Sequence, residues 1–181
     1  HCKKIYIYQN QSSPEFDADC KKVIQIIKKN IGKNVIFYRP PKHLPSEKSI
    51  VYAITKFFEL EKYGTIFEDD CLPSKPFWDS ITFFQKEQLR YDKFVFNGFT
   101  PVPQRRSVCI ISKKKYLHVW GWTTNALTWQ QFLKKYEIEN LTLNKILNLG
   151  FSFKISLYWF FIFRLVSIRK INTWDYKFLY Y

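Results

Sequence analysis

The sequence of 181 residues lacks methionine, has about half as many acidic as basic residues, and contains no long apolar run. Its longest uninterrupted apolar run, Leu157 to Phe163, is far shorter than the roughly 20 residues that cross a bilayer. We therefore expect no transmembrane segment. No signal peptide is expected either, because Lys3 and Lys4 are followed by alternating residues rather than by an apolar stretch.

Cysteine is also scarce, and its spacing excludes the common frameworks. The four cysteines form no CxxC pair, and no histidine lies at a usual zinc spacing from them. They are Cys2, Cys20, Cys71 and Cys109. We expect reduced thiols and a cytoplasmic protein, with peripheral contact to a membrane as the alternative.

The chain is rich in apolar side chains, since 46% of its residues are hydrophobic and 20% are aromatic. This content is enough for a substantial core without disulfides or metals, and it excludes a disordered tail. We find no internal repeat and no low-complexity linker, so one domain over residues 1–181 is predicted. Because residue 1 is His and a strand is predicted almost at once, we expect this segment to belong to a longer protein.

The basic excess has two interpretations. Lys and Arg number 29 against 15 Asp and Glu, which gives a formal net charge of +14. The basic residues are spread along the chain with modest clusters at 105–106 and 113–115, so a solvated surface is favoured and nucleic acid is not an expected partner. A phosphate-rich ligand or an anionic membrane surface is also compatible with the charge.

Strands and helices alternate in the first half of the sequence. β-Branched and aromatic runs predict strands over residues 4–8, 35–38, 64–67 and 94–96. Helical spacing predicts helices after Ser13, after Ser46 and from near Pro76. A strand at 110–111, a turn at 120–122 and a mostly helical stretch from 129 to 171 follow. This order favours an α/β fold with a mostly parallel sheet covered by helices on both faces.

Three acidic residues, Glu68, Asp69 and Asp70, directly follow the third predicted strand. Ligands of such sheets bind beyond the carboxyl ends of the strands, and adjacent carboxylates repel unless a cation offsets them. Oxygen ligands suit Mg²⁺ or Mn²⁺. The alternative is a solvated strand end at which Asp70 caps the next turn.

Residues 48–50, 65–74, 118–124 and 171–176 resemble, in this order, segments of a family of GT-A nucleotide-diphospho-sugar glycosyltransferases. Residues 65–74 (TIFEDDCLPS) resemble its "ILEDDCLPS" metal-binding segment, and 48–50 resemble its "GKSI" helix. Residues 118–124 resemble "HIWGWATW", and 171–176 resemble "IDTWDYQW". Looser similarity extends to viral glycosyltransferases of this fold and to N-acetylglucosaminyltransferase I. The resemblance implies a Rossmann-like GT-A sheet that lacks its first strand and helix, in a chain truncated at both ends.

This resemblance implies transfer of a sugar from a nucleotide-diphosphate donor, most typically a UDP-sugar, to a glycan or glycoprotein hydroxyl with inversion. It implies that Asp70 is the direct ligand of Mn²⁺ or Mg²⁺, while Glu68 and Asp69 orient the ribose, the metal-bound waters or the sugar. A metal there stabilises charge on the departing diphosphate as a Lewis acid.

By the same resemblance, Asp175 is the general base for the acceptor hydroxyl. The alternative for Asp175 is an ordinary acid in the first turn of a helix. Lys48, at a helix start, is implied to meet a phosphate, and a solvated lysine is the other interpretation. At 43–45 this chain has His-Leu-Pro where the family more often has "NLG".

The resemblance further implies that Trp120, Gly121 and Trp122 line the donor or acceptor and that His118 belongs to the site. Aromatic faces suit sugar C–H surfaces, and glycine permits close approach of the backbone. Core aromatics beside a tight turn, with a packed histidine, are the alternative. For Trp129 we expect a core position.

Three other functions remain compatible with the sequence. One is a Mg²⁺-dependent phosphotransferase or nuclease, which needs further carboxylates such as Asp92 and Asp175. Another is a noncatalytic basic module for nucleic acid or an anionic membrane, with residues 155–168 docking on the membrane surface instead of packing on the sheet. The last is an inactive, truncated relative of the glycosyltransferases.

Overall fold

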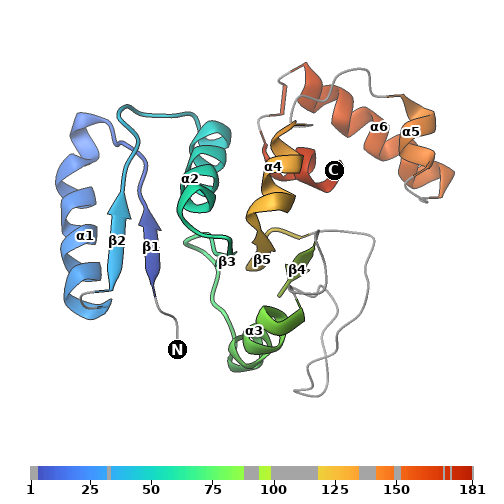
Figure 1. Cartoon of the computed structure of the whole chain (residues 1–181). Helices are drawn as coiled ribbons and strands as arrows, with labels where there is room; N and C mark the ends of the chain where they lie inside the picture. The colour runs from blue at the N-terminus through green and yellow to red at the C-terminus, as the bar shows by residue number, and fades with distance from the viewer. Residues whose placement is uncertain are drawn as a thin grey trace. The chain divides into compact units, whose positions relative to one another are not determined.

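The computed structural model describes residues 4–31, 34–87, 94–98, 118–134, 142–148, 152–168, 170–171 and 173–180 (Figure 1). Its internal contacts divide the chain into two compact units, residues 1–57 and 58–181. Whether the two form a single domain, as the sequence predicts, stays a prediction. The chain mixes α and β structure, in agreement with the expected class.

The first unit is built on two parallel strands, β1 (Ile5–Tyr8) and β2 (Val35–Tyr38), paired from Ile5↔Val35 to Tyr8↔Tyr38. A 3₁₀ turn (Pro14–Phe16) and helix α1 (Asp17–Ile31) connect them. Both strands and the helix lie where the sequence predicts them. Ser13 stands at the predicted N-cap position, but its hydroxyl donates to the Glu15 carboxylate at 3.0 Å instead of capping the turn.

Helix α2 (Ser46–Leu60) begins at the predicted residue and packs on this sheet through its inner face. The Tyr38 hydroxyl donates to the Ala53 carbonyl at 2.8 Å, and the Tyr8 hydroxyl lies 3.0 Å from the Ser49 hydroxyl. Burial raises the pKa of Tyr38 to about 12, so its hydroxyl stays protonated and keeps donating over the physiological pH range.

The second unit contains a three-stranded antiparallel sheet in the order β3-β5-β4. Its strands are β3 (Tyr63–Ile66), β4 (Val95–Asn97) and β5 (Trp122–Asn125). Helix α3 (Lys75–Glu87) follows β3, as predicted. The expectation of a mostly parallel sheet is wrong for the described strands of this unit, because the unpredicted strand β5 lies between β3 and β4 and runs antiparallel to both.

Side-chain hydroxyls of β5 help to hold it in that central place. The Thr123 and Thr65 hydroxyls are 2.8 Å apart, and the Thr124 hydroxyl donates to the Phe94 carbonyl at 2.6 Å. Threonine therefore adds cross-strand hydrogen bonds to the backbone ladder of a short strand. The predicted strand at 110–111 lies outside the described residues.

Four further helices follow in the described part of the second unit, three of them in or overlapping the stretch from 129 to 171 that the sequence predicts to be mostly helical. The helices are α4 (Ala126–Lys134), α5 (Leu143–Leu147), α6 (Phe153–Ser167) and α7 (Asp175–Tyr180). An aromatic core joins β5, α4 and α7 through five buried rings: Trp122, Trp129, Phe132, Trp174 and Phe178. The predicted core position of Trp129 is confirmed, since this residue is only 1% exposed.

Helix α6 buries one face and exposes the other. Ser156, Phe163 and Val166 are buried, whereas Tyr158 and Phe161 are exposed. The buried side of α6 packs against α5 and α7, and the packing on the sheet that the sequence predicts stays a prediction. In the part of the chain that the structure describes, no helix combines the length and apolar character needed to cross a membrane.

Candidate functional site

The three acidic residues form a tight turn at the carboxyl end of β3. The Cys71 N–H donates to the Glu68 carbonyl at 3.1 Å and closes the turn. This geometry holds the Glu68 side chain partly buried and leaves Asp69 and Asp70 exposed to solvent. The acidic run thus has two environments, one facing the protein and one facing water.

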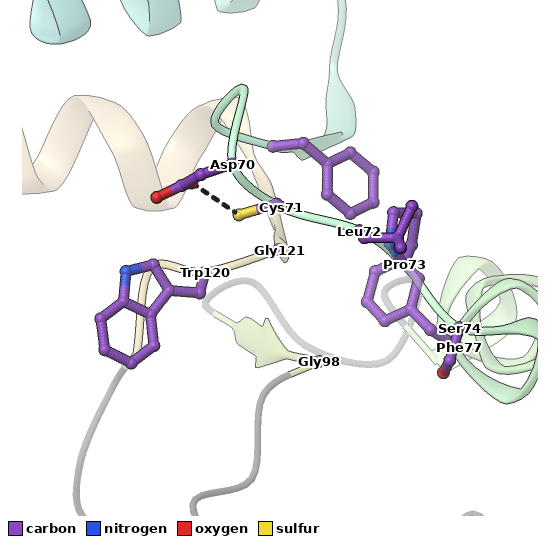
Figure 2. Close-up of a pocket in the computed structure, with 10 residues that line it drawn as sticks. Asp70, Cys71, Leu72, Pro73, Ser74, Phe77, Gly98, Trp120 and Gly121 are labelled. Atoms are coloured by element: carbon purple, nitrogen blue, oxygen red, sulfur yellow. Dashed lines mark hydrogen bonds between the residues drawn. The ribbon is translucent and has the colours of Figure 1, made fainter.

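A pocket of about 330 Å³ lies beside this turn. Its walls come from the turn and the start of α3, from the residue after β4, and from the segment before β5 (Figure 2). The lining residues are Phe67, Asp70, Cys71, Leu72, Pro73, Ser74, Phe77, Gly98, Trp120 and Gly121. Segments far apart in the sequence therefore share one concavity, which is large enough for part of a small ligand.

Two glycines shape the wall of this pocket. The Gly98 N–H donates to the Gly121 carbonyl at 2.8 Å, and a Cβ at Gly98 would collide with the Phe77 ring. Gly121 has a φ of +69°, in the left-handed region that favours glycine. A larger residue at either position would disturb the wall, while the predicted close approach of a ligand to the Gly121 backbone stays a prediction.

The carboxylate of Glu68 lies in a negative environment. Burial raises its pKa most, and the charges of Asp70, Asp175 and Asp69 raise it further, while a hydrogen bond from the Trp174 side chain lowers it. The residue at the start of α7 is therefore within electrostatic range of a turn more than 100 positions earlier in the chain. Two predicted site segments, around residues 68–70 and 175, come together in the second unit.

Asp175 is the first residue of α7, so the interpretation as a first-turn acid is confirmed. Its side chain is partly buried, and this burial raises its pKa. Backbone N–H groups of Tyr176 and of Asp175 itself oppose that shift. A carboxylate with increased proton affinity, held by a helix start, has the properties of a general base. That role stays a prediction.

The tryptophans around Gly121 have different positions. Trp120 is 50% exposed, lines the pocket and stacks on His118 with a ring-centroid distance of 6.1 Å and an interplanar angle of 15°. In the view of Figure 2, Asp70 and Trp120 flank one end of the pocket. Trp122 is 0% exposed and packs in the aromatic core, so the lining role expected for it is wrong. Trp120 precedes β5, which begins at Trp122, and the positive φ of Gly121 turns the backbone between the two rings. The rule that residues two apart on a strand share a face therefore does not apply to this pair.

Several site residues were not identified from the sequence. Trp174 contacts Glu68, and Phe77 and Gly98 form part of the pocket wall. Trp174 directly precedes Asp175 and matches the tryptophan of the "IDTWDYQW" segment, which is the signal that could have identified it. Lys48 lies exposed in the first turn of α2 in the first unit, so its predicted phosphate contact stays a prediction.

We tested whether the acidic turn suits a divalent cation. Within the described ranges, no three His, Cys, Asp or Glu side chains are arranged to hold a metal ion. Ion pairs among those same residues do not involve Asp69 or Asp70, and the Asp70 carboxylate accepts only the Cys71 thiol at 3.7 Å. The residues fit an ion held by one protein carboxylate together with phosphates of a ligand, which is a common arrangement for Mg²⁺.

Comparisons with known proteins found no match: no family model, no curated protein and no solved structure matches the chain. The functional interpretation therefore depends on the motifs of the sequence and on the geometry of the site.

Proposed function

We propose that this chain belongs to a metal-dependent glycosyltransferase of GT-A fold, which transfers a sugar from a nucleotide-diphosphate donor to an acceptor hydroxyl with inversion. One observation carries the proposal: a pocket bordered by Asp70 and Trp120 adjoins a cluster of four carboxylates that Asp175 completes. An acid for a metal, an aromatic face for a sugar and a partly buried base are the three groups that this reaction needs.

Asp70 is the residue that would hold Mn²⁺ or Mg²⁺, because its carboxylate is exposed and borders the pocket. When bound, such an ion supplies Lewis-acid stabilisation of the negative charge that develops on the leaving diphosphate. The Glu68 side chain, in contrast to that of Asp70, is partly buried. Its hydrogen bond from Trp174 fixes its carboxylate, so Glu68 orients the turn and adds negative charge behind Asp70.

Asp175 would accept the proton of the acceptor hydroxyl on a carboxylate oxygen. Burial raises the pKa of Asp175, which makes it a stronger base than a surface aspartate. Trp120 offers an exposed indole face to the apolar side of a sugar ring, and its stacking on His118 limits the orientations of that face.

Activity measurements with a panel of UDP- and GDP-sugars, with Mn²⁺ or Mg²⁺, test the proposal. Asp70→Asn should abolish transfer and donor hydrolysis with little change in Tm, because Asp70 is exposed. Asp175→Asn should reduce transfer at least about 100-fold, the usual contribution of a general base, while metal-dependent nucleotide binding remains.

Asp79→Asn is the matched control, since Asp79 is exposed on α3 and does not line the pocket. It should keep full activity. Full activity of Asp70→Asn would remove the metal-ligand assignment, and loss of nucleotide binding in Asp175→Asn would argue against the base role.

A further inference from the structure

Helix α6 exposes a stripe of large apolar side chains along its outer side. The stripe consists of Leu157, Tyr158, Phe161 and Ile168, all of which are exposed, and Phe161 keeps 59% of its surface accessible. The other three lie three, four or seven residues from Phe161, so the four side chains share one side of the helix. Single exposed apolar residues are common, whereas a contiguous row of them marks an interaction surface.

The opposite side of α6 already has its packing partners. Phe163 forms a buried cluster with Ile146 of α5, and Trp159, Phe160 and Tyr176 pack against this cluster. Helices α5 and α6 lie side by side in Figure 1 and are in contact along their packed faces. The helix is therefore held by its inner side, and the outer stripe is left for a partner outside the described residues.

Two exposed cations lie on the same side of α6 as the stripe. Lys154 precedes Phe161 by seven residues and Arg164 follows it by three, so they stand near the two ends of the stripe. Neither takes part in an ion pair with the described residues. Long cationic side chains extend beyond neighbouring apolar groups and keep their charge in a polar layer while those groups enter an apolar one.

The sequence around α6 is positive throughout. Residues 140–174 contain no Asp or Glu, and their five cations are Lys145, Lys154, Arg164, Arg169 and Lys170. A partner that carries negative charge beside an apolar layer complements such a surface, and an anionic lipid bilayer is the partner with that chemistry.

A second copy of this chain fits the same surface less well. If two α6 helices met through their stripes, Lys154 or Arg164 of one copy would face a cation of the other in either relative direction, and like charges opposite one another weaken an interface. Helix α6 has 15 residues and is about 22 Å long, which suits a helix that lies in the plane of a membrane surface.

We propose that α6 docks the second unit on an anionic lipid bilayer. The apolar side chains of the stripe enter the boundary between headgroups and acyl chains, where the amphipathic ring of Tyr158 is also favoured. Lys154 and Arg164 contact the lipid phosphates from the two ends of the stripe. This membrane contact goes beyond the proposed glycosyl transfer and does not depend on it.

Cosedimentation of the chain with lipid vesicles tests the proposal. The vesicles are made of phosphatidylcholine alone or of phosphatidylcholine with about 30% phosphatidylglycerol. Wild type should bind the anionic vesicles saturably and the neutral ones more weakly. Phe161→Ser should weaken binding to anionic vesicles at least about fivefold through the loss of an inserted ring, with little change in Tm because Phe161 is exposed.

Lys154→Gln should weaken the same binding about fivefold, the usual effect of one cation at an anionic membrane surface. If Phe161→Ser unfolds, Ile168→Ser at the end of α6 is the second variant, with the same expected loss of binding.

The matched controls are Phe83→Ser and Lys134→Gln. Phe83 is an exposed phenylalanine on α3, and Lys134 is an exposed cation at the end of α4. Each should change vesicle binding less than about twofold, because neither belongs to the stripe and a charge away from the membrane surface is screened by salt. Asp70→Asn should bind vesicles as wild type does, which separates this test from that of the acidic turn.

Four results would overturn the proposal. They are absent binding to anionic vesicles, equal binding to both kinds of vesicle, equal losses in Phe161→Ser and Phe83→Ser, and a dimer in sedimentation velocity that Phe161→Ser dissociates. The last result would assign the stripe to a second copy of the chain instead of a membrane.

Discussion

Neutralising Glu68 should stabilise the folded protein while damaging its function. In Glu68→Gln, the buried charge and its repulsion by Asp69, Asp70 and Asp175 are removed, and the amide oxygen can still accept the hydrogen bond from Trp174. Charged groups that are placed to bind a ligand often lower the free energy of unfolding of the protein when the ligand is absent. A gain in stability is therefore the signature of a binding site rather than of a structural acid.

The sign of the effect depends on pH. Burial, followed by the neighbouring carboxylates, raises the pKa of Glu68 above its ordinary value of 4.5. The folded state therefore binds this proton more tightly than the unfolded chain does, and Glu68 lowers stability as the pH rises from about 4.5 through the raised folded pKa. The advantage of Glu68→Gln should be larger at neutral pH than at acidic pH and should vanish below about pH 4.5.

The magnitude is modest because Glu68 retains contact with solvent. After a discount for screening, we expect a gain of about 0.5–1 kcal/mol in the free energy of unfolding. For a chain of this length, 1 kcal/mol corresponds to roughly 2–4 °C, so the Tm should rise by about 1–4 °C.

Thermal unfolding followed by circular dichroism, at neutral pH and near pH 4, provides the measurement. Asp79→Asn is the control, since it changes the net charge equally on an exposed surface. If Glu68→Gln is no more stable than Asp79→Asn at neutral pH, the carboxylates do not repel one another as described and the cluster is not a strained binding site.

Two further substitutions test the local structure. Gly121→Ala should lower the unfolding free energy by about 1–2 kcal/mol, because an alanine is strained at a φ of +69°; an unchanged Tm would contradict the positive φ. Thr123→Val should cost about 1 kcal/mol, since Thr123 is buried and its loss leaves the Thr65 hydroxyl, 2.8 Å away, without this partner. The double variant with Thr65→Val should recover much of that loss, and strictly additive losses measured by chemical denaturation would refute the pairing.

The first half of the fold could be predicted because its signals are local. Residues 5–8 and 35–38 are β-branched or aromatic and are bounded by polar residues and prolines, and Pro14 and Ser46 mark helix starts. Strand β5 could not be predicted in the same way. Trp122, Thr123 and Thr124 favour a strand, but the run is only four residues long and directly follows Gly121, so the sequence indicated a turn there. The strand is fixed by pairing with β3 and β4, which are distant in the sequence.

The candidate site was likewise only partly visible in the sequence. The run of acids at 68–70 stands out because it follows an apolar strand, and Asp175 stands out by its motif. The sequence could not distinguish exposed Trp120 from buried Trp122, because that difference depends on which ring the aromatic core encloses.

Titration calorimetry with UDP, GDP and UDP-sugars, with and without Mn²⁺, tests the proposed site most directly. We expect a nucleotide to bind wild type only when Mn²⁺ is present, and we expect Asp70→Asn to lose this binding while Asp79→Asn retains it. Nucleotide binding that is independent of Mn²⁺, or that survives unchanged in Asp70→Asn, would contradict a metal-bridged diphosphate at the acidic turn.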